Sequence, residues 1–75
     1  MYLIIFKTSV TTTQQVSELA PLLSSHPQVK EHNFDLEDCD NILRIVSTSP
    51  EPRHVCHVLE QQGFCCEEME SFVYD

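Results

Sequence analysis

The chain has 75 residues, a formal net charge of −8 at neutral pH and an apolar fraction of 41%. This length fits one small domain, and the apolar fraction fits a packed core rather than a disordered tail. Twelve acidic residues against only four lysines and arginines argue against binding to nucleic acid or to an anionic membrane surface. A solvated acidic surface explains this charge without any ligand, although a basic partner or a cation is also compatible with it.

The apolar run at the N-terminus covers residues 1–6 and is followed at once by Lys7 and polar residues. It is far shorter than the roughly 20 apolar residues of a membrane-spanning helix, and no basic segment precedes it. We therefore expect a cytoplasmic protein with no membrane association. The cysteines at positions 39, 56, 65 and 66 are expected to be free thiols in that reducing compartment. Cys65 and Cys66 are adjacent, so in a strand they would point to opposite faces, and we do not expect a disulfide between them.

The first half of the chain predicts a strand and a helix. Residues 2–8 are β-branched and aromatic, which is typical of a strand that is apolar on both faces. The threonines at 11–13 supply a helix N-cap, and we expect a helix over about residues 12–25. Its apolar residues recur at helical spacing: Val16, Leu19, Leu22 and Leu23. Pro21 removes one backbone hydrogen bond and should kink this helix or weaken its last turn.

A β-hairpin is predicted next. Apolar and polar residues alternate from His32 to Leu36, as in a half-buried strand. Residues 38–41 are acidic and polar and have the composition of a turn. Residues 42–46 are largely aliphatic and make the returning strand.

The last part of the chain predicts a second helix and a short strand. Ser49 is expected to cap the helix, Pro50 to occupy its first position and Gly63 to stop it. Residues 64–69 should form the last strand, and residues 70–75 a flexible tail. The whole chain, 1–75, is then one α+β domain with a ferredoxin-like βαββαβ order. Such a domain has a four-stranded antiparallel sheet, two helices on one face, and the first and third strands in the centre.

In this order and at this spacing, the sequence resembles the heavy-metal-associated domains of soluble metallochaperones and metal-transport ATPases. The resemblance runs from Phe6 to about Met69. It rests on several short segments, which are Phe6-Lys7-Thr8, Val29 with residues 32–37, residues 42–46, Val55, Leu59 and Gly63-Phe64.

The family's metal motif, Met-x-Cys-x-x-Cys, is missing from this chain. Its methionine falls on Val10 and its two cysteines fall on Thr12 and Gln15. Two thiolates in this position clamp Cu(I) or join a zinc site, whereas a hydroxyl and an amide cannot replace them for a soft cation. The family's metal function is therefore not expected here, and Thr12 has the chemistry of a helix cap.

Substitute metal ligands would have to come from the second helix and the last strand. His54 and His57 share one side of a helix, whereas Cys56 points about 100° away from His57. Two histidines at this spacing can hold a divalent ion with a third ligand, and none is evident. Cys65 and Cys66 are further candidates, although the two glutamates after them offer no positive charge to lower a thiol pKa. The alternatives are a solvated helix surface for the histidines, and one packed and one incidental thiol for the cysteines.

Catalysis has no local support in the sequence. The histidines at 26, 32, 54 and 57 have no neighbouring partner that would form a triad or activate a nucleophile. The single glycine excludes a Gly-rich phosphate loop. Cys39 lies among acidic residues of the hairpin turn, which could hold a hard cation only weakly. We therefore expect a protein that is not an enzyme and needs no cofactor.

The alternation of the strands predicts which residues face the helices. Seven belong to that face: Ile4, Phe6, His32, Phe34, Leu36, Leu43 and Ile45. The other face then carries four aliphatic residues on the two central strands: Leu3, Ile5, Ile42 and Val46. Because an open sheet face is usually polar, such a patch suggests a protein partner or a second copy of the chain. Alternatively, charged neighbours and the C-terminal residues cover it.

These observations favour a non-enzymatic binding domain with a degenerate heavy-metal-associated fold. The alternative is a metal-binding protein or metallochaperone that uses the substitute histidine and cysteine ligands. A resemblance in fold alone does not establish a function, and the metal motif that would indicate the family's function is absent.

Overall fold

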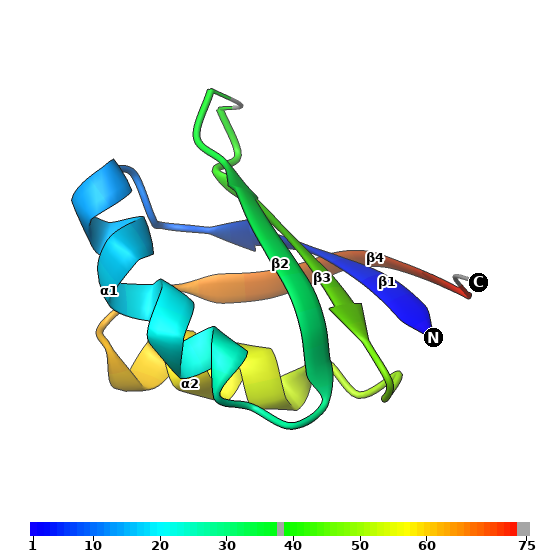
Figure 1. Ribbon diagram of the computed structural model, residues 1–75. Coiled ribbons are helices and arrows are strands. Elements are labelled where there is room, and N and C mark those ends of the chain that lie inside the picture. Colours follow the sequence, from blue (N-terminus) through cyan, green and yellow to red (C-terminus); the bar gives the residue numbers. More distant parts are fainter. Residues whose placement is uncertain (38, 74–75) are drawn as a thin grey trace.

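The computed structural model describes residues 1–37 and 39–73. Its elements follow the order β1 (Tyr2–Thr8), α1 (Thr13–Ser24), β2 (Val29–Asp35), β3 (Ile42–Ser47), α2 (Arg53–Gln61) and β4 (Cys66–Val73). The strands form one sheet in the order β2-β3-β1-β4, and all neighbours are antiparallel. Both helices cover the same face of this sheet (Figure 1). The predicted ferredoxin-like arrangement, with β1 and β3 in the centre, is confirmed.

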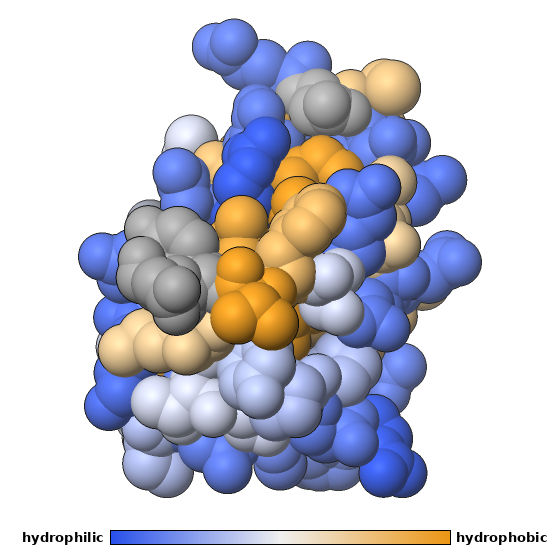
Figure 2. All heavy atoms as spheres, turned by 90° about the vertical axis from the view of Figure 1, so that its right-hand side faces the viewer, coloured by the Kyte–Doolittle hydropathy of each residue, from blue (hydrophilic) through white to orange (hydrophobic). Residues whose placement is uncertain are grey.

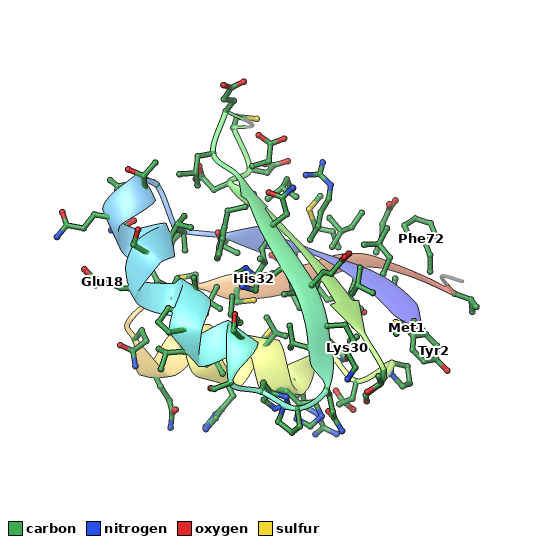
Figure 3. All side chains as sticks on the ribbon, viewed as in Figure 1. Met1, Tyr2, Glu18, Lys30, His32 and Phe72 are labelled. Carbon is green, nitrogen blue, oxygen red and sulfur yellow. The ribbon has the colours of Figure 1, made fainter. Side chains whose placement is uncertain are left out.

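The core lies between the sheet and the two helices. Four strand residues of the predicted helix-facing set, Ile4, Phe6, Leu43 and Ile45, are at most 1% exposed. They pack with apolar residues of both helices and of the loop after β1: Val10, Leu19, Leu23, Val55 and Leu59. The rest of the predicted set lies at the β2 edge, where Phe34 and Leu36 pack against this core. His32 extends from β2 towards α1, and its Nε2 lies 3.1 Å from the Ser24 hydroxyl oxygen (Figure 3).

The second helix begins later than the sequence predicts. The predicted cap at Ser49 and start at Pro50 are wrong, because α2 starts at Arg53 with Pro52 in the N-cap position. A residue before proline is kept out of the helical region, so Pro52 prevents Glu51 from joining the helix. The Glu51 carboxylate instead accepts hydrogen bonds from the backbone N–H and the guanidinium of Arg53. Ser49 accepts from the Glu51 backbone N–H at 3.2 Å and shapes the preceding turn.

The end of α2 agrees with the sequence. Gly63 has a φ of 88°, a left-handed conformation that few other residues adopt without strain. The Gly63 N–H donates to the Glu60 carbonyl, and the Phe64 N–H donates to the Leu59 carbonyl, both at 3.0 Å. This pair of bonds is a Schellman motif, and it turns the chain from α2 towards β4. In α1, by contrast, Pro21 does not end the helix, which continues to Ser24.

The last strand is longer than the sequence predicts. The predicted strand over residues 64–69 and the predicted tail from residue 70 are wrong in their bounds, because β4 begins at Cys66 and continues to Val73. Its second half pairs with the start of β1, so that Phe72 lies opposite Leu3. The glutamates of β4 have low strand propensity, but on an edge strand they remain in water while the backbone pairs with β1. Residues 74 and 75 of the predicted tail, and Asp38 of the predicted turn, lie outside the described residues.

Within residues 1–37 and 39–73, no helix is long and apolar enough to cross a membrane.

Candidate functional site

The loop between β1 and α1, where the metal motif of the resembling family would lie, is occupied by a helix cap. The Thr12 hydroxyl accepts a hydrogen bond from the Gln15 backbone N–H at 3.1 Å. The Gln15 side-chain carbonyl accepts from the backbone N–H groups of Thr12 at 3.2 Å and Thr11 at 2.8 Å. This reciprocal arrangement is a capping box, and it confirms Thr12 as the N-cap of α1. Both side chains therefore bond to the backbone of the loop itself, and Val10 is fully buried beneath it.

The histidines of α2 lie along a surface groove. His54 is half-buried, and its ring lies 4.9 Å from the ring of His26, which precedes β2. The groove is also lined by His57, Cys56 and Cys66. Across residues 1–37 and 39–73, however, no three His, Cys, Asp or Glu side chains are placed to hold a metal ion. Of the four substitute ligands, His54, His57 and Cys66 line this groove, whereas Cys65 lines a separate pocket.

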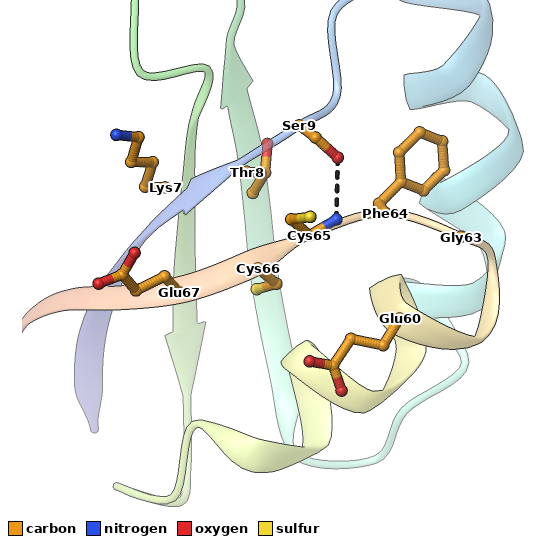
Figure 4. A pocket seen from close by; sticks show the side chains of 9 residues that line it. All are labelled: Lys7, Thr8, Ser9, Glu60, Gly63, Phe64, Cys65, Cys66 and Glu67. Atoms are coloured by element: carbon orange, nitrogen blue, oxygen red, sulfur yellow. Dashed lines mark hydrogen bonds between the residues drawn. The ribbon is translucent and has the colours of Figure 1, made fainter.

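Cys65 and Cys66 face different surroundings at the start of β4. Cys65 is exposed, and its backbone N–H donates to the Ser9 hydroxyl at 2.8 Å. A shallow pocket is formed here by the end of β1, the end of α2 and the turn that follows it (Figure 4). Cys66 is half-buried and packs against the core, as expected for one member of the pair.

The two half-buried cysteines touch each other, a contact that the sequence did not reveal. The Cys56 thiol donates a hydrogen bond to Cys66 Sγ, and the two sulfur atoms lie 3.2 Å apart. Burial raises the pKa of both thiols above the ordinary value, and most strongly that of Cys66. The signal was present in the sequence as a cysteine on the inner side of α2 and another at the start of β4. Without the true start of β4, the two could not be placed opposite each other.

The face of the sheet away from the helices carries the predicted aliphatic patch. Leu3 lies opposite Val46 on β3 and opposite Phe72 on β4, and Ile5 is the next residue of β1 on the same face. Ile42 is at the other end of β3, opposite Lys7. We call Leu3, Ile5, Ile42, Val46 and Phe72 the open sheet surface. Phe72 was missed by the sequence reasoning because residues 70–75 were expected to be a tail.

The open sheet surface is unevenly exposed. Ile42 and Val46 are 6% and 9% exposed, so their cross-strand neighbours cover them more fully than the sequence predicts. Leu3 and Ile5 are half-buried, and Phe72 is 48% exposed. Phe72 lies near Met1 and Tyr2 at the end of the sheet that is far from α1 (Figure 3). Figure 2, viewed from the right-hand side of Figure 1, shows hydrophobic residues gathered in the middle of that side with hydrophilic residues around them.

Acidic side chains flank the open sheet surface. Strand β2 contributes Glu31 and Asp35 from one edge, and β4 contributes Glu67 and Glu70 from the other. The basic residues between them are paired with carboxylates. Arg44 lies 3.8 Å from Asp35, and Lys7 lies 3.7 Å from Asp40 in the turn before β3. The surface is therefore an apolar strip with negatively charged edges.

No model of a protein family matches the chain, and a search of curated proteins finds no significant relative.

Proposed function

We propose that this chain is a non-enzymatic binding domain, related in architecture to the heavy-metal-associated domains, whose binding surface is the open sheet surface rather than the loop after β1. The resemblance of the sequence to that family supports the kinship, and the capping box in place of the thiolate pair supports the change of function. The half-buried thiols fit a reducing compartment, so the proposal places the protein in the cytoplasm.

The observation that carries the proposal is the apolar strip on the uncovered face of the sheet. An antiparallel sheet with one face in water normally alternates apolar and polar residues, with the polar ones outside. Here aliphatic residues of β1 and β3 continue into Phe72 of β4, a residue that is 48% exposed. Contiguous apolar surface on a small protein is typical of interaction sites.

The charges around the strip define the chemistry of the partner. The chain has a net charge of −8, and acidic residues of β2 and β4 line both sides of the strip. A second copy would bring the same acidic edges against these, and the two basic residues between the edges, Lys7 and Arg44, already pair with carboxylates of their own chain, so a basic partner fits the charges better. A segment with apolar residues flanked by lysine or arginine would instead complement both the strip and its edges. We therefore propose a basic, amphipathic protein segment as the partner.

The proposal is tested with two fluorescently labelled peptides, one alternating leucine with lysine and one alternating leucine with glutamate. The lysine peptide should bind, with an affinity that falls as salt is added, and the glutamate peptide should not. Ile5→Glu should weaken binding because it places a charge in the strip. Leu22→Glu is the matched control, since Leu22 is an exposed leucine on α1, away from the strip. Equal effects of the two substitutions, or equal binding of both peptides, would contradict the proposal.

The alternative function, metal binding through substitute ligands, is separated by titrating the reduced protein. Cu(I) and Zn²⁺ are added in competition with a chelator of known affinity. The proposal expects no tight one-to-one complex with either ion. A tight complex that His54→Ala or Cys66→Ser weakens would favour the metal-binding alternative instead.

A further inference from the structure

Cys56 and Cys66 are brought together by two elements that meet at the end of the second βαβ half. Cys56 lies on α2 between the buried residues Val55 and Leu59. Cys66 is the first residue of β4, where pairing with Thr8 of β1 fixes its position. The Schellman motif at Gly63 sets the turn between the two elements. Both sulfur atoms are thus held by the fold, 3.2 Å apart and 10 positions apart in the sequence.

We propose that Cys56 and Cys66 are a dithiol that low-molecular-weight disulfides, such as oxidised glutathione, convert reversibly into an intramolecular disulfide joining α2 to β4. The contact between the sulfur atoms is the observation that carries this assignment. Both cysteines also line the surface groove beside His54 and Glu60, so a small disulfide can approach them from solvent.

The reaction proceeds in two thiol–disulfide exchanges. In the first, the Cys56 thiolate attacks one sulfur of the small disulfide, forms a mixed disulfide and releases one small thiol. In the second, Cys66 loses its proton and attacks Cys56 Sγ, which closes the protein disulfide and releases the second small thiol. The protein gives up two electrons and two protons, and the small disulfide takes them up as two thiols.

The surroundings of the two thiols determine their order and speed. The pKa of the Cys66 thiol is raised more strongly than that of Cys56, so Cys56 is the first to lose its proton and to attack. After this loss the Cys66 S–H can donate to the Cys56 thiolate, the reverse of the bond between the two protonated thiols. Burial and the nearby Glu60 raise the pKa of both thiols, which keeps the thiolate fraction low at neutral pH. The disulfide should therefore form slowly at neutral pH and faster as the pH rises. Once Cys56 has reacted, the adjacent Cys66 closes the bond within the same chain.

The test incubates the full chain in mixtures of oxidised and reduced glutathione, quenches with acid and alkylates the remaining thiols. Intact mass should show a species that has lost two hydrogen atoms and carries two alkyl groups, on the exposed Cys39 and Cys65. Cleavage after glutamates separates Cys56 from Cys66, because Glu60 lies between them. The two peptides should remain linked until reduction, and fragmentation between Cys65 and Cys66 identifies the bonded sulfur.

Cys65→Ser is the matched control and should leave the cross-link unchanged, whereas Cys66→Ser should abolish it. If Cys66→Ser fails to fold, the peptide map of the natural chain still decides the question. Three results would overturn the proposal. They are a cross-link to Cys65, disulfide-linked dimers as the main product, or Cys56 and Cys66 both still reduced when Cys39 and Cys65 carry glutathione.

Discussion

Replacing Thr12 with alanine tests whether the loop after β1 is built as a helix cap. The Thr12 hydroxyl accepts one bond, from the Gln15 N–H at 3.1 Å, and this bond is exposed to water. Loss of a threonine N-cap costs about 0.5–2 kcal/mol, and water can replace an exposed partner, so we expect about 1 kcal/mol here. For a domain of this size, that loss lowers Tm by about 4–8 °C.

The assay is urea unfolding followed by far-UV circular dichroism. Thr13→Ala is the matched control, because Thr13 is an exposed threonine inside α1 that makes no cap bond, and alanine there should be neutral or slightly stabilising. Thr12→Ser keeps the hydroxyl and should stay near the natural stability. If Thr12→Ala is as stable as the natural chain, or if Thr13→Ala costs as much, the loop is not held by this cap.

Three further outcomes are expected. Gly63→Ala should lower the free energy of unfolding in urea by about 1–2 kcal/mol, because a φ of 88° strains a residue that has a Cβ. No atom lies within 4 Å of the added Cβ, so no clash adds to this strain, and an unchanged stability would refute the prediction. The reduced protein should lose stability as pH rises above the ordinary thiol pKa of about 8.5. Folding raises the pKa of Cys56 and Cys66, so the unfolded chain releases those two protons at lower pH than the folded chain does. Urea unfolding at several pH values measures this loss, and the double variant Cys56→Ala, Cys66→Ala should show a flatter dependence of stability on pH. Thr12→Cys combined with Gln15→Cys should create a tight Cu(I) site in a chelator competition, and no gain over the natural chain would contradict the positional match to the metal motif.

The fold could be predicted from the sequence because it depends on patterns that many residues share. The alternation in β1 and β3 assigned Ile4, Phe6, Leu43 and Ile45 to the core, and each is fully or almost fully buried. Gly63 marked the end of α2 for a reason local to its own backbone. These features need no knowledge of distant contacts.

The errors lie where a distant contact or a neighbouring proline outweighs local preference. The start of α2 moved to Arg53 because Pro52 restricts Glu51, although Ser49 and Pro50 fit a helix start on their own. Strand β4 reaches Val73 because the backbone groups of β1 on that side pair with it. The amino-acid types of residues 70–73 alone do not predict this pairing. The same error hid Phe72 from the predicted surface.

The contact between Cys56 and Cys66 could not be predicted for a related reason. It depends on the position of α2 over the sheet and on the register of β4, and both are tertiary features. A sequence pattern gives the side of a helix that is buried, but it does not give the residue that meets it.

The most direct test of the proposed function is an NMR titration of the isotope-labelled protein with the leucine–lysine peptide. The proposal predicts that amide shifts concentrate on β1, β3 and the end of β4, with Leu3, Ile5 and Phe72 among the most affected. Shifts confined to α1, α2 or the capped loop at Thr12, or no shifts with a peptide concentration well above that of the protein, would contradict it.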